Sequence, residues 1–160
     1  MDRAQFINLV NGEQEQLRKF LLALCMGSRD EADDIAQEAL VKAYLSSSGY
    51  QDEGKFTAWL YKIAYNTFLD HMKSRRTSAP LDACKHLSDG TTADKNFQYQ
   101  ELYGALDGLP PKERTSILLF YIKGYSVKEI SKIVECTEDA VKKQLSRGRE
   151  HLRQKMGSRY

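Results

Sequence analysis

The chain has 160 residues, of which 41% are hydrophobic and 29% charged, and its formal net charge is +2. These values are ordinary for a globular protein of one or two small domains. No apolar run approaches the roughly 20 residues of a membrane-spanning helix. The N-terminal segment also lacks the pattern of a signal peptide. We therefore expect a cytoplasmic protein.

Helical periodicity dominates the first half of the chain and predicts three helices. The first carries apolar residues from Phe6 to Leu24 and ends near Gly27. The second covers about residues 31–45, after a capping Asp30, and its inner face comprises Ala32, Ile35, Ala36, Ala39, Leu40 and Ala43. The third covers about residues 55–75, and its inward side chains are Phe56, Trp59, Leu60, Ile63 and Thr67.

Residues 77–96 are rich in Ser, Thr, Asp and Gly and have no sustained period, which is typical of a flexible linker. This segment divides the chain into two domains, residues 1–76 and residues 97–160. No part of the sequence shows convincing strand-like alternation. The predicted fold class is all-α, with two small helical domains.

The second half predicts a short helix near residues 97–107 and another over about 111–123, with Pro111 in its first turn. Gly124 ends the latter, and Ser126 with Glu129 forms a capping box for a further short helix. A tight turn and a capping Thr137 lead into a long basic helix. A helix of about eight residues, a tight turn and a longer helix together predict a helix-turn-helix.

The three cysteines, Cys25, Cys84 and Cys136, are odd in number and widely spaced, which indicates reduced thiols and no disulfide framework. Cys84 and His86 are close in sequence, but two potential ligands without a second pair are a weak metal signal. We expect no metal and no cofactor.

Positive charge is concentrated in the C-terminal part. Residues 97–160 contain 12 Lys and Arg against 8 Asp and Glu, whereas residues 1–76 contain 10 against 11. Lys143 and Arg147 of the long helix point away from its apolar stripe. This distribution predicts a polyanionic partner, and the helix-turn-helix indicates that this partner is duplex DNA. The alternative is an ordinary solvated surface helix.

Two further patterns lie in the N-terminal half. Asp34, Gln37 and Glu38 form one polar patch with Val41 beside it, which favours a protein partner over an ordinary solvated face.

The third helix carries a stripe of polar side chains near two tyrosines. Basic groups interleaved with aromatic rings suit a nucleic-acid backbone with unstacked bases. These aromatic residues are equally suited to a core. The residues concerned are Lys62, Asn66 and Lys73, with Tyr61 and Tyr65.

Three segments, taken in order, resemble the extracytoplasmic-function sigma factors of the sigma-70 family. They are DEADDIAQEALVKAY, FTAWLYKIAYNTFLDHMKSRR and LDGLPPKERTSILLFYIKGYSVKEISKIVECTEDAVKKQLSRGREHLR. The resemblance implies conserved regions 2 and 4 joined by a variable linker. It also implies a promoter-specificity subunit without catalytic chemistry, which binds core RNA polymerase and recognises the −10 and −35 promoter elements. An anti-sigma factor is a plausible further partner.

The resemblance also implies roles for individual residues. Core polymerase would bind Asp34, Gln37, Glu38 and Val41. A flipped-out base of the −10 element would enter the loop that includes Ser46, Ser47, Ser48 and Tyr50, while Lys62, Asn66 and Lys73 support the separated strand. The −35 element would be contacted by Thr137, Glu138, Lys142, Lys143, Ser146 and Arg147, with Arg149 and Arg153 nearer the phosphates.

Two other classes of function compete with this interpretation. A stand-alone regulator with the same helix-turn-helix would have a sensory or dimerising N-terminal half and would bind duplex DNA without polymerase. An enzyme would need a catalytic arrangement, but His71, His86 and His151 occur in no recognisable motif and no Gly-rich phosphate loop is present. The predicted linker and the patch around Asp34 favour the sigma factor over both.

Overall fold

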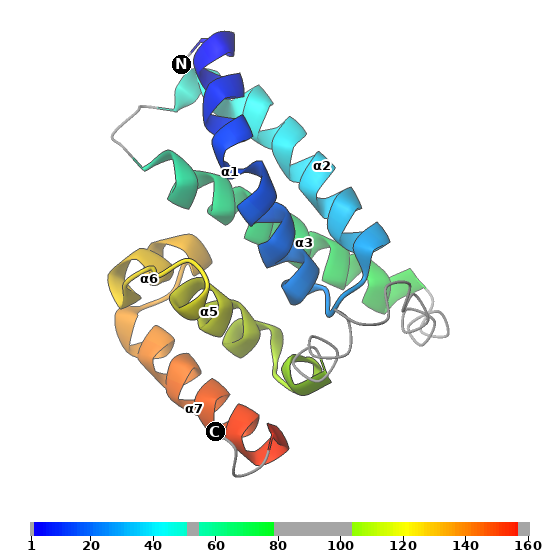
Figure 1. The fold of residues 1–160 in the computed structure, drawn as a ribbon, viewed down its shortest axis with the longest axis vertical. Coiled ribbons are helices and arrows are strands. Elements are labelled where there is room, and N and C mark those ends of the chain that lie inside the picture. The colour runs from blue at the N-terminus through cyan, green and yellow to red at the C-terminus, as the bar shows by residue number, and fades with distance from the viewer. Residues whose placement is uncertain (1, 51–54, 79–103, 157–160) are drawn as a thin grey trace.

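The computed structural model describes residues 2–50, 55–78 and 104–156, and every regular element in these ranges is helical. The helices are α1 (Arg3–Leu24), α2 (Arg29–Ser46), the 3-10 helix η1 (Ser47–Gly49), α3 (Phe56–Ser78), α5 (Pro111–Tyr121), α6 (Val127–Val134) and α7 (Glu138–Met156) (Figure 1). The predicted all-α fold is confirmed. The predicted linker lies outside the described residues, except residues 77–78, which belong to α3.

Helices α1, α2 and α3 form a bundle around an apolar core. Helix α2 contributes small side chains at helical spacing, which allow the neighbouring helices to approach closely. Ala32, Ala36, Ala39 and Ala43 are all buried. The predicted inner face of α2 is therefore confirmed except for Leu40, which is only partly buried, as are Trp59 and Ile63 of α3. The predicted cap Asp30 is wrong: Ser28 is the N-cap residue, and Asp30 lies in the first turn.

Helices α5, α6 and α7 form the predicted helix-turn-helix with its supporting helix. The Ser126 hydroxyl accepts a hydrogen bond from the Glu129 N–H, and the Glu129 carboxylate accepts one from the Ser126 N–H. This capping box is confirmed. The α6 helix ends at Glu135, which adopts a left-handed conformation with φ of 56°. The Thr137 hydroxyl then accepts a hydrogen bond from the Ala140 N–H at 3.1 Å, so the predicted cap of α7 is also confirmed.

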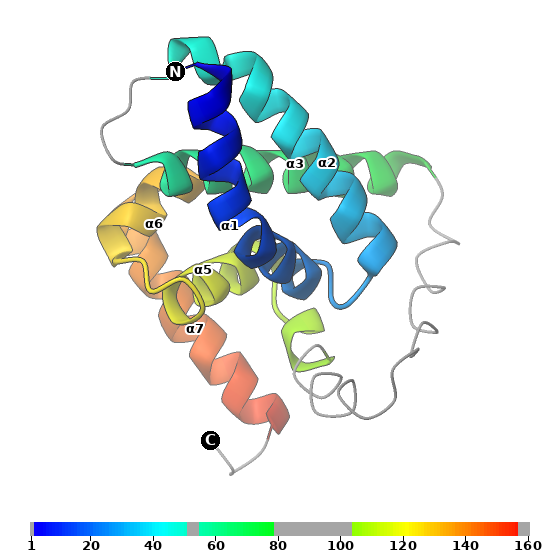
Figure 2. The same ribbon diagram turned by 45° about the horizontal axis from the view of Figure 1, so that its top comes forward.

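The two halves of the chain pack against each other and share one apolar core, which the linker-based division did not foresee. Helix α6 packs on α3, and α5 packs on α1 (Figure 2). The Arg114 side chain of α5 lies within this contact and is 3% exposed. Its guanidinium donates hydrogen bonds of 2.9–3.0 Å to the carbonyl oxygens of Leu24, Leu106 and Leu109. Burial lowers the pKa of Arg114, and the nearby Asp107 opposes this effect.

We expect Arg114→Met to lower the free energy of unfolding by about 2–6 kcal/mol, because a buried carbonyl group that loses its donor costs about 1–3 kcal/mol. The carbonyl groups of Leu24 and Leu109 lose theirs, whereas that of Leu106 keeps the Leu109 N–H. Chemical denaturation would measure the change. Lys112→Met is the matched control, since Lys112 is exposed on the same helix. Equal stability of the two variants would contradict this role of Arg114.

Two glycines allow a second test of packing. A Cβ atom on Gly148 of α7 would lie 2.8 Å from Cγ1 of Ile117, whereas one on Gly12 of α1 would have no atom within 4 Å. Gly12→Ala should therefore gain about 0.5–1 kcal/mol from helix propensity alone. Gly148→Ala should lose about 1 kcal/mol, because overpacking outweighs the same gain. Stabilisation of both variants in denaturation experiments would contradict close packing of α5 on α7.

Candidate functional site

The outer face of α2 combines charge with exposed apolar side chains. Asp34 and Gln37 are exposed, as the sequence pattern predicts. Val41 is 58% exposed and Leu45 is 73% exposed. Large aliphatic side chains on an otherwise polar helix are typical of a surface that another protein covers. We call Asp34, Gln37, Val41 and Leu45 the α2 patch.

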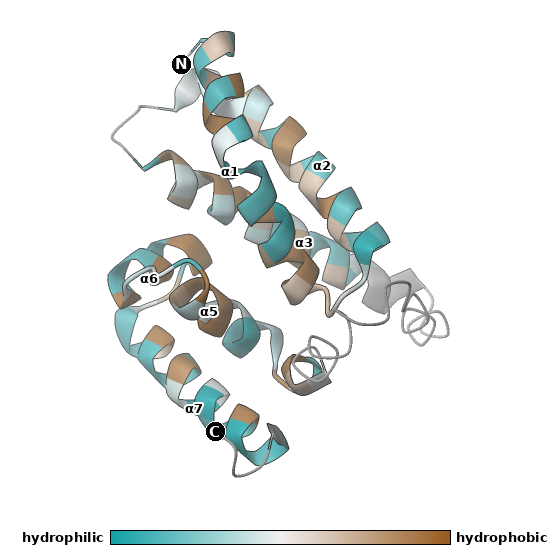
Figure 3. Cartoon of the chain, viewed as in Figure 1, coloured by the Kyte–Doolittle hydropathy of each residue, from teal (hydrophilic) through white to brown (hydrophobic). Residues whose placement is uncertain are grey.

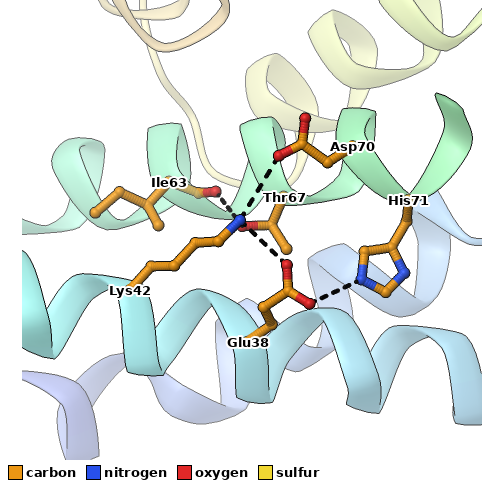
Figure 4. A network of polar contacts seen from close by, with 6 residues as sticks. All are labelled: Glu38, Lys42, Ile63, Thr67, Asp70 and His71. Carbon is orange, nitrogen blue, oxygen red and sulfur yellow. Dashed lines mark hydrogen bonds and ion pairs between the residues drawn. The ribbon is translucent and has the colours of Figure 1, made fainter. Parts of the chain in front are cut away.

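Glu38 of α2 has a different environment, because its carboxylate also joins α2 to α3 (Figure 4). It pairs with Lys42 at 3.1 Å and with His71 at 3.3 Å. Lys42 also reaches Asp70 at 3.6 Å and the Thr67 hydroxyl at 3.4 Å. Hydrogen bonds from Lys42 and His71 lower the pKa of Glu38. Glu38, which is predicted to bind core polymerase, therefore links α2 to α3. Its side chain is still 45% exposed.

The residues predicted to receive a −10 base differ in their environments. Ser46 ends α2, and Ser48 is exposed in η1. Ser47 is buried, and its hydroxyl donates a hydrogen bond to the Tyr44 carbonyl oxygen at 2.7 Å. The Tyr50 ring packs on Trp59, with 4.7 Å between centroids. Residues 51–54 of this predicted loop lie outside the described residues.

Helix α3 presents the predicted polar stripe, but its two tyrosines are covered. Lys62 and Asn66 are half-buried and Lys73 is exposed. Tyr61 is 0% exposed and Tyr65 is 3% exposed. Burial is the main cause of the raised pKa of both phenols. The Tyr61 ring packs on Phe20 of α1, with 5.0 Å between centroids, as well as on the C-terminal half, so the aromatic part of the stripe belongs to the core and its polar part reaches the surface.

Helix α7 exposes a basic face. Figure 3 shows α7 as mainly hydrophilic with hydrophobic bands. Val141 and Leu145 of this helix are buried. Among the described residues, Lys142, Lys143 and Arg147 are exposed and have no hydrogen bond or ion pair. These cations are free to contact an external anion.

The remaining predicted residues of α7 have partners within the chain, lie at the start of the helix or, like Ser146, are exposed in mid-helix. Arg149 donates a hydrogen bond to the Tyr121 hydroxyl at 2.9 Å, and Arg153 pairs with Glu150. Ser146 is exposed, and Glu138 lies in the first turn. Thr137 caps the helix, so its hydroxyl oxygen already accepts a hydrogen bond.

The side chain of Gln144 in α7 braces the helix-turn-helix. Its carboxamide oxygen accepts a hydrogen bond of 2.6 Å from the Ser116 hydroxyl, and its amide lies 3.8 Å from the Cys136 sulfur. Helical spacing locates Gln144 near the basic face. It does not reveal that a buried serine of α5 satisfies the amide.

Sequence reasoning missed the residues that join the two halves. Lys123, directly after α5, pairs with Glu13 of α1 at 3.1 Å. Its ammonium also lies 5.1 Å from the centroid of the Tyr61 ring. Tyr125 packs edge-on against Tyr61, with 6.2 Å between centroids. The partners of the Lys123–Glu13 ion pair are 110 residues apart in sequence, so no local motif marks this contact.

The described parts of the chain contain neither a candidate metal centre nor a membrane span. No cluster of three or more His, Cys, Asp or Glu residues there is arranged to hold a metal ion. Cys84 and His86 lie outside the described residues. No described helix is long and apolar enough to cross a membrane.

Comparisons with known proteins identify the family. The model of sigma-70 region 2 matches residues 9–77, and the model of sigma-70 region 4 matches residues 99–152. The ECF RNA polymerase sigma factor SigW of Bacillus subtilis is 30% identical, over 97% of this chain and 90% of its own length. The ECF RNA polymerase sigma factor EcfG of Rhodopseudomonas palustris is 31% identical, over 85% of this chain and 76% of its own length.

Two solved structures have the same fold over both halves of the chain. One is the sigma factor RpoE in complex with the anti-sigma factor NepR from Bartonella quintana, with a TM-score of 0.80 and 24% identity over 98% of this chain and 99% of that chain. The other is CnrH in complex with the cytosolic domain of CnrY, with a TM-score of 0.75 and 20% identity over 99% and 92%. The two region models and the full-length relatives agree that the chain belongs to the ECF sigma factors of the sigma-70 family.

Proposed function

We propose that this sigma factor binds core RNA polymerase through the α2 patch and directs it to promoters through α3 and α7. The observation that carries the polymerase contact is the exposure of Val41 and Leu45 beside Asp34. Burial of such aliphatic groups contributes about 25 cal/mol per Å² of apolar area. The neighbouring carboxylate adds electrostatic selectivity for a basic partner.

The promoter contacts divide between two kinds of DNA. The free cations of α7 suit duplex DNA, because neutralising phosphates releases counterions. We assign the −35 element to this helix, with Lys142, Lys143 and Arg147 as its main contacts. We assign the separated strand of the −10 element to the stripe Lys62, Asn66 and Lys73 and to the segment from Ser46 to Tyr50. Within that segment Ser47 supports the turn through its bond to the Tyr44 carbonyl oxygen, rather than contacting a base.

Other properties follow from the family and from this assignment. The protein acts as a transcription initiation factor without catalytic chemistry of its own, and it works in the cytoplasm, where the polymerase is. One protein of the same fold, RpoE of Bartonella quintana, was solved with the anti-sigma factor NepR. An anti-sigma factor is therefore a further proposed partner. It would compete with core RNA polymerase for the exposed α2 patch.

Replacing Asp34 by Lys together with Val41 by Ser should weaken binding to core RNA polymerase by at least about tenfold, because both a charge and a desolvated contact are lost. Both side chains are exposed, so the free energy of unfolding should change by less than about 0.5 kcal/mol. Titration of labelled protein with core polymerase would measure the affinity.

The matched control combines Glu15→Lys with Ile7→Ser, which makes the same chemical changes at exposed positions on α1. Equal affinities of the two double variants would contradict the assignment of the α2 patch. Failure of the wild-type protein to bind core polymerase, combined with tight binding to duplex DNA, would support a stand-alone regulator instead.

Replacing Lys143 and Arg147 by Ala should weaken promoter binding by the polymerase complex. The plot of log affinity against log salt should lose about 2 units of slope, since each phosphate contact contributes about 0.9. The probe is a promoter fragment selected from genomic DNA by the complex itself. The control Lys19→Ala with Arg29→Ala removes two exposed cations from the N-terminal half. An unchanged slope for the α7 variant would mean that these side chains do not reach DNA.

A further inference from the structure

One cation of α7 is oriented by a tyrosine from another helix. Arg149 donates a hydrogen bond of 2.9 Å from Nη1 to the hydroxyl oxygen of Tyr121, the last residue of α5. Both residues are exposed, Tyr121 by 56%. Lys142 lies seven residues before Arg149, which is close to two helical turns, so the two cations share one side of α7. The pair therefore borders the basic face that is proposed to contact duplex DNA.

The partner of Arg149 fixes its direction without compensating its charge. Arg153, one turn further along α7, pairs with the Glu150 carboxylate. Among the described residues, Arg149 pairs with no carboxylate, and its hydrogen bond goes to a neutral phenol. A guanidinium has five N–H donors, so a single bond leaves most of them for an external anion. Because the side chain is already ordered, its binding to that anion costs less entropy.

The Tyr121 hydroxyl retains a donor of its own. A phenol can accept hydrogen bonds and donate one. The bond from Arg149 uses its oxygen as the acceptor, and no described residue accepts a hydrogen bond from its O–H group. The hydroxyl proton and the remaining guanidinium N–H groups are therefore neighbouring donors. A phosphate group, which is negatively charged and offers acceptor oxygens, suits both.

Packing within the helix-turn-helix holds the pair in this position. The Ser116 hydroxyl donates a hydrogen bond of 2.6 Å to the Gln144 carboxamide oxygen, which joins α5 to α7 (Figure 1). The Tyr121 ring packs edge-on against Phe120, with 5.0 Å between centroids. Phe120 is partly buried and packs against the core. The hydroxyl is thus held at a defined place beside Arg149.

We propose that Tyr121 and Arg149 form a phosphate clamp, in which both side chains donate hydrogen bonds to one phosphate group of duplex DNA. This inference rests on the proposed contact between α7 and the −35 element, and it adds to that contact a neutral side chain from α5. Phosphate contacts fix the register of a protein on DNA without reading the bases. The clamp would therefore position α7 on the duplex and would not select base pairs.

The first test removes the hydroxyl alone. Tyr121→Phe keeps the ring on Phe120 and should weaken binding to a promoter fragment by about fivefold, because a hydrogen bond to a charged group is lost. The fragment is one selected from genomic DNA by the polymerase complex, and core polymerase is saturating. The slope of log affinity against log salt should stay unchanged, since no charge is lost. Arg149→Ala should weaken binding about tenfold and lower that slope by about 0.9.

Tyr44→Phe is the matched control for loss of a hydroxyl. Tyr44 of α2 is 47% exposed, and its ring packs edge-on against Phe6 as the Tyr121 ring does against Phe120. Promoter affinity should be the same for Tyr44→Phe and the wild type. If Tyr121→Phe lowered stability in chemical denaturation but left promoter affinity unchanged, the hydroxyl would only brace α5 against α7, and the proposal would be wrong.

A double variant shows whether the two residues act as a unit. In an Arg149→Ala background, Tyr121→Phe should cost at most about a further twofold in affinity, because residues that share one ligand group are coupled. Independent action would instead multiply the two losses to about fiftyfold. That result would contradict the clamp.

A scan of the DNA backbone locates the phosphate. One phosphate at a time is replaced by a neutral methylphosphonate across the −35 part of the fragment. The wild type and Tyr44→Phe should lose about tenfold in affinity at several positions, and at one of these Tyr121→Phe and Arg149→Ala should each lose at most about twofold. Equal sensitivity of Tyr121→Phe and the wild type at every position would overturn the proposal.

The same scan with the free protein separates this inference from the proposed function. Normal binding to core polymerase and promoter DNA, with no phosphate that responds to Tyr121→Phe, would overturn the clamp alone. A responding phosphate on duplex DNA bound by the free protein, in a chain that does not bind core polymerase, would support the clamp and contradict the proposed function. A wild-type chain that binds no duplex DNA, with or without polymerase, would contradict both.

Discussion

The packing of the two halves depends on the hydrogen bonds that the Arg114 guanidinium donates. This guanidinium is buried, no carboxylate of the described residues pairs with it, and three backbone carbonyl groups satisfy it. One of these, Leu24, is the last residue of α1, where the helix dipole favours a cation. A planar group with donors on several sides can bind carbonyl oxygens from separate segments simultaneously, which an ammonium does less well. Arg114 thereby anchors α5 to both α1 and the helical turn at residues 104–107.

The position of α5 then decides where the other C-terminal helices lie. Helix α7 packs closely along α5, because Gly148 leaves room for Ile117. The Ser116–Gln144 hydrogen bond joins the same pair of helices. Helix α6 is thereby brought onto α3. The two surfaces best suited to external partners, the α2 patch and the basic face of α7, stay exposed, whereas the aromatic face of α3 is covered.

The polar interactions of the chain fall into two classes with different consequences. The network around Lys42 and Glu38 joins helices within the N-terminal half, is partly exposed and is screened by water. The contacts of Arg114 and Lys123 join the two halves and are largely buried. Buried polar contacts are strong only while every group is satisfied, and the hydroxyls of Tyr61 and Tyr125 have no partner among the described residues. The junction therefore carries a desolvation cost.

Much of this protein can be predicted from its sequence, because helices, caps and apolar faces depend on local spacing. The all-α fold, the Ser126–Glu129 capping box, the Thr137 cap and the exposed Asp34, Gln37 and Val41 all follow from residues within a few turns of one another. The three segments that resemble ECF sigma factors also identify the family. Only the tertiary structure decided which polar side chains face inward, such as Ser47, Gln144 and Arg114. It also decided that the two halves meet, since pairs such as Lys123 and Glu13 lie too far apart in sequence for any periodicity to connect them.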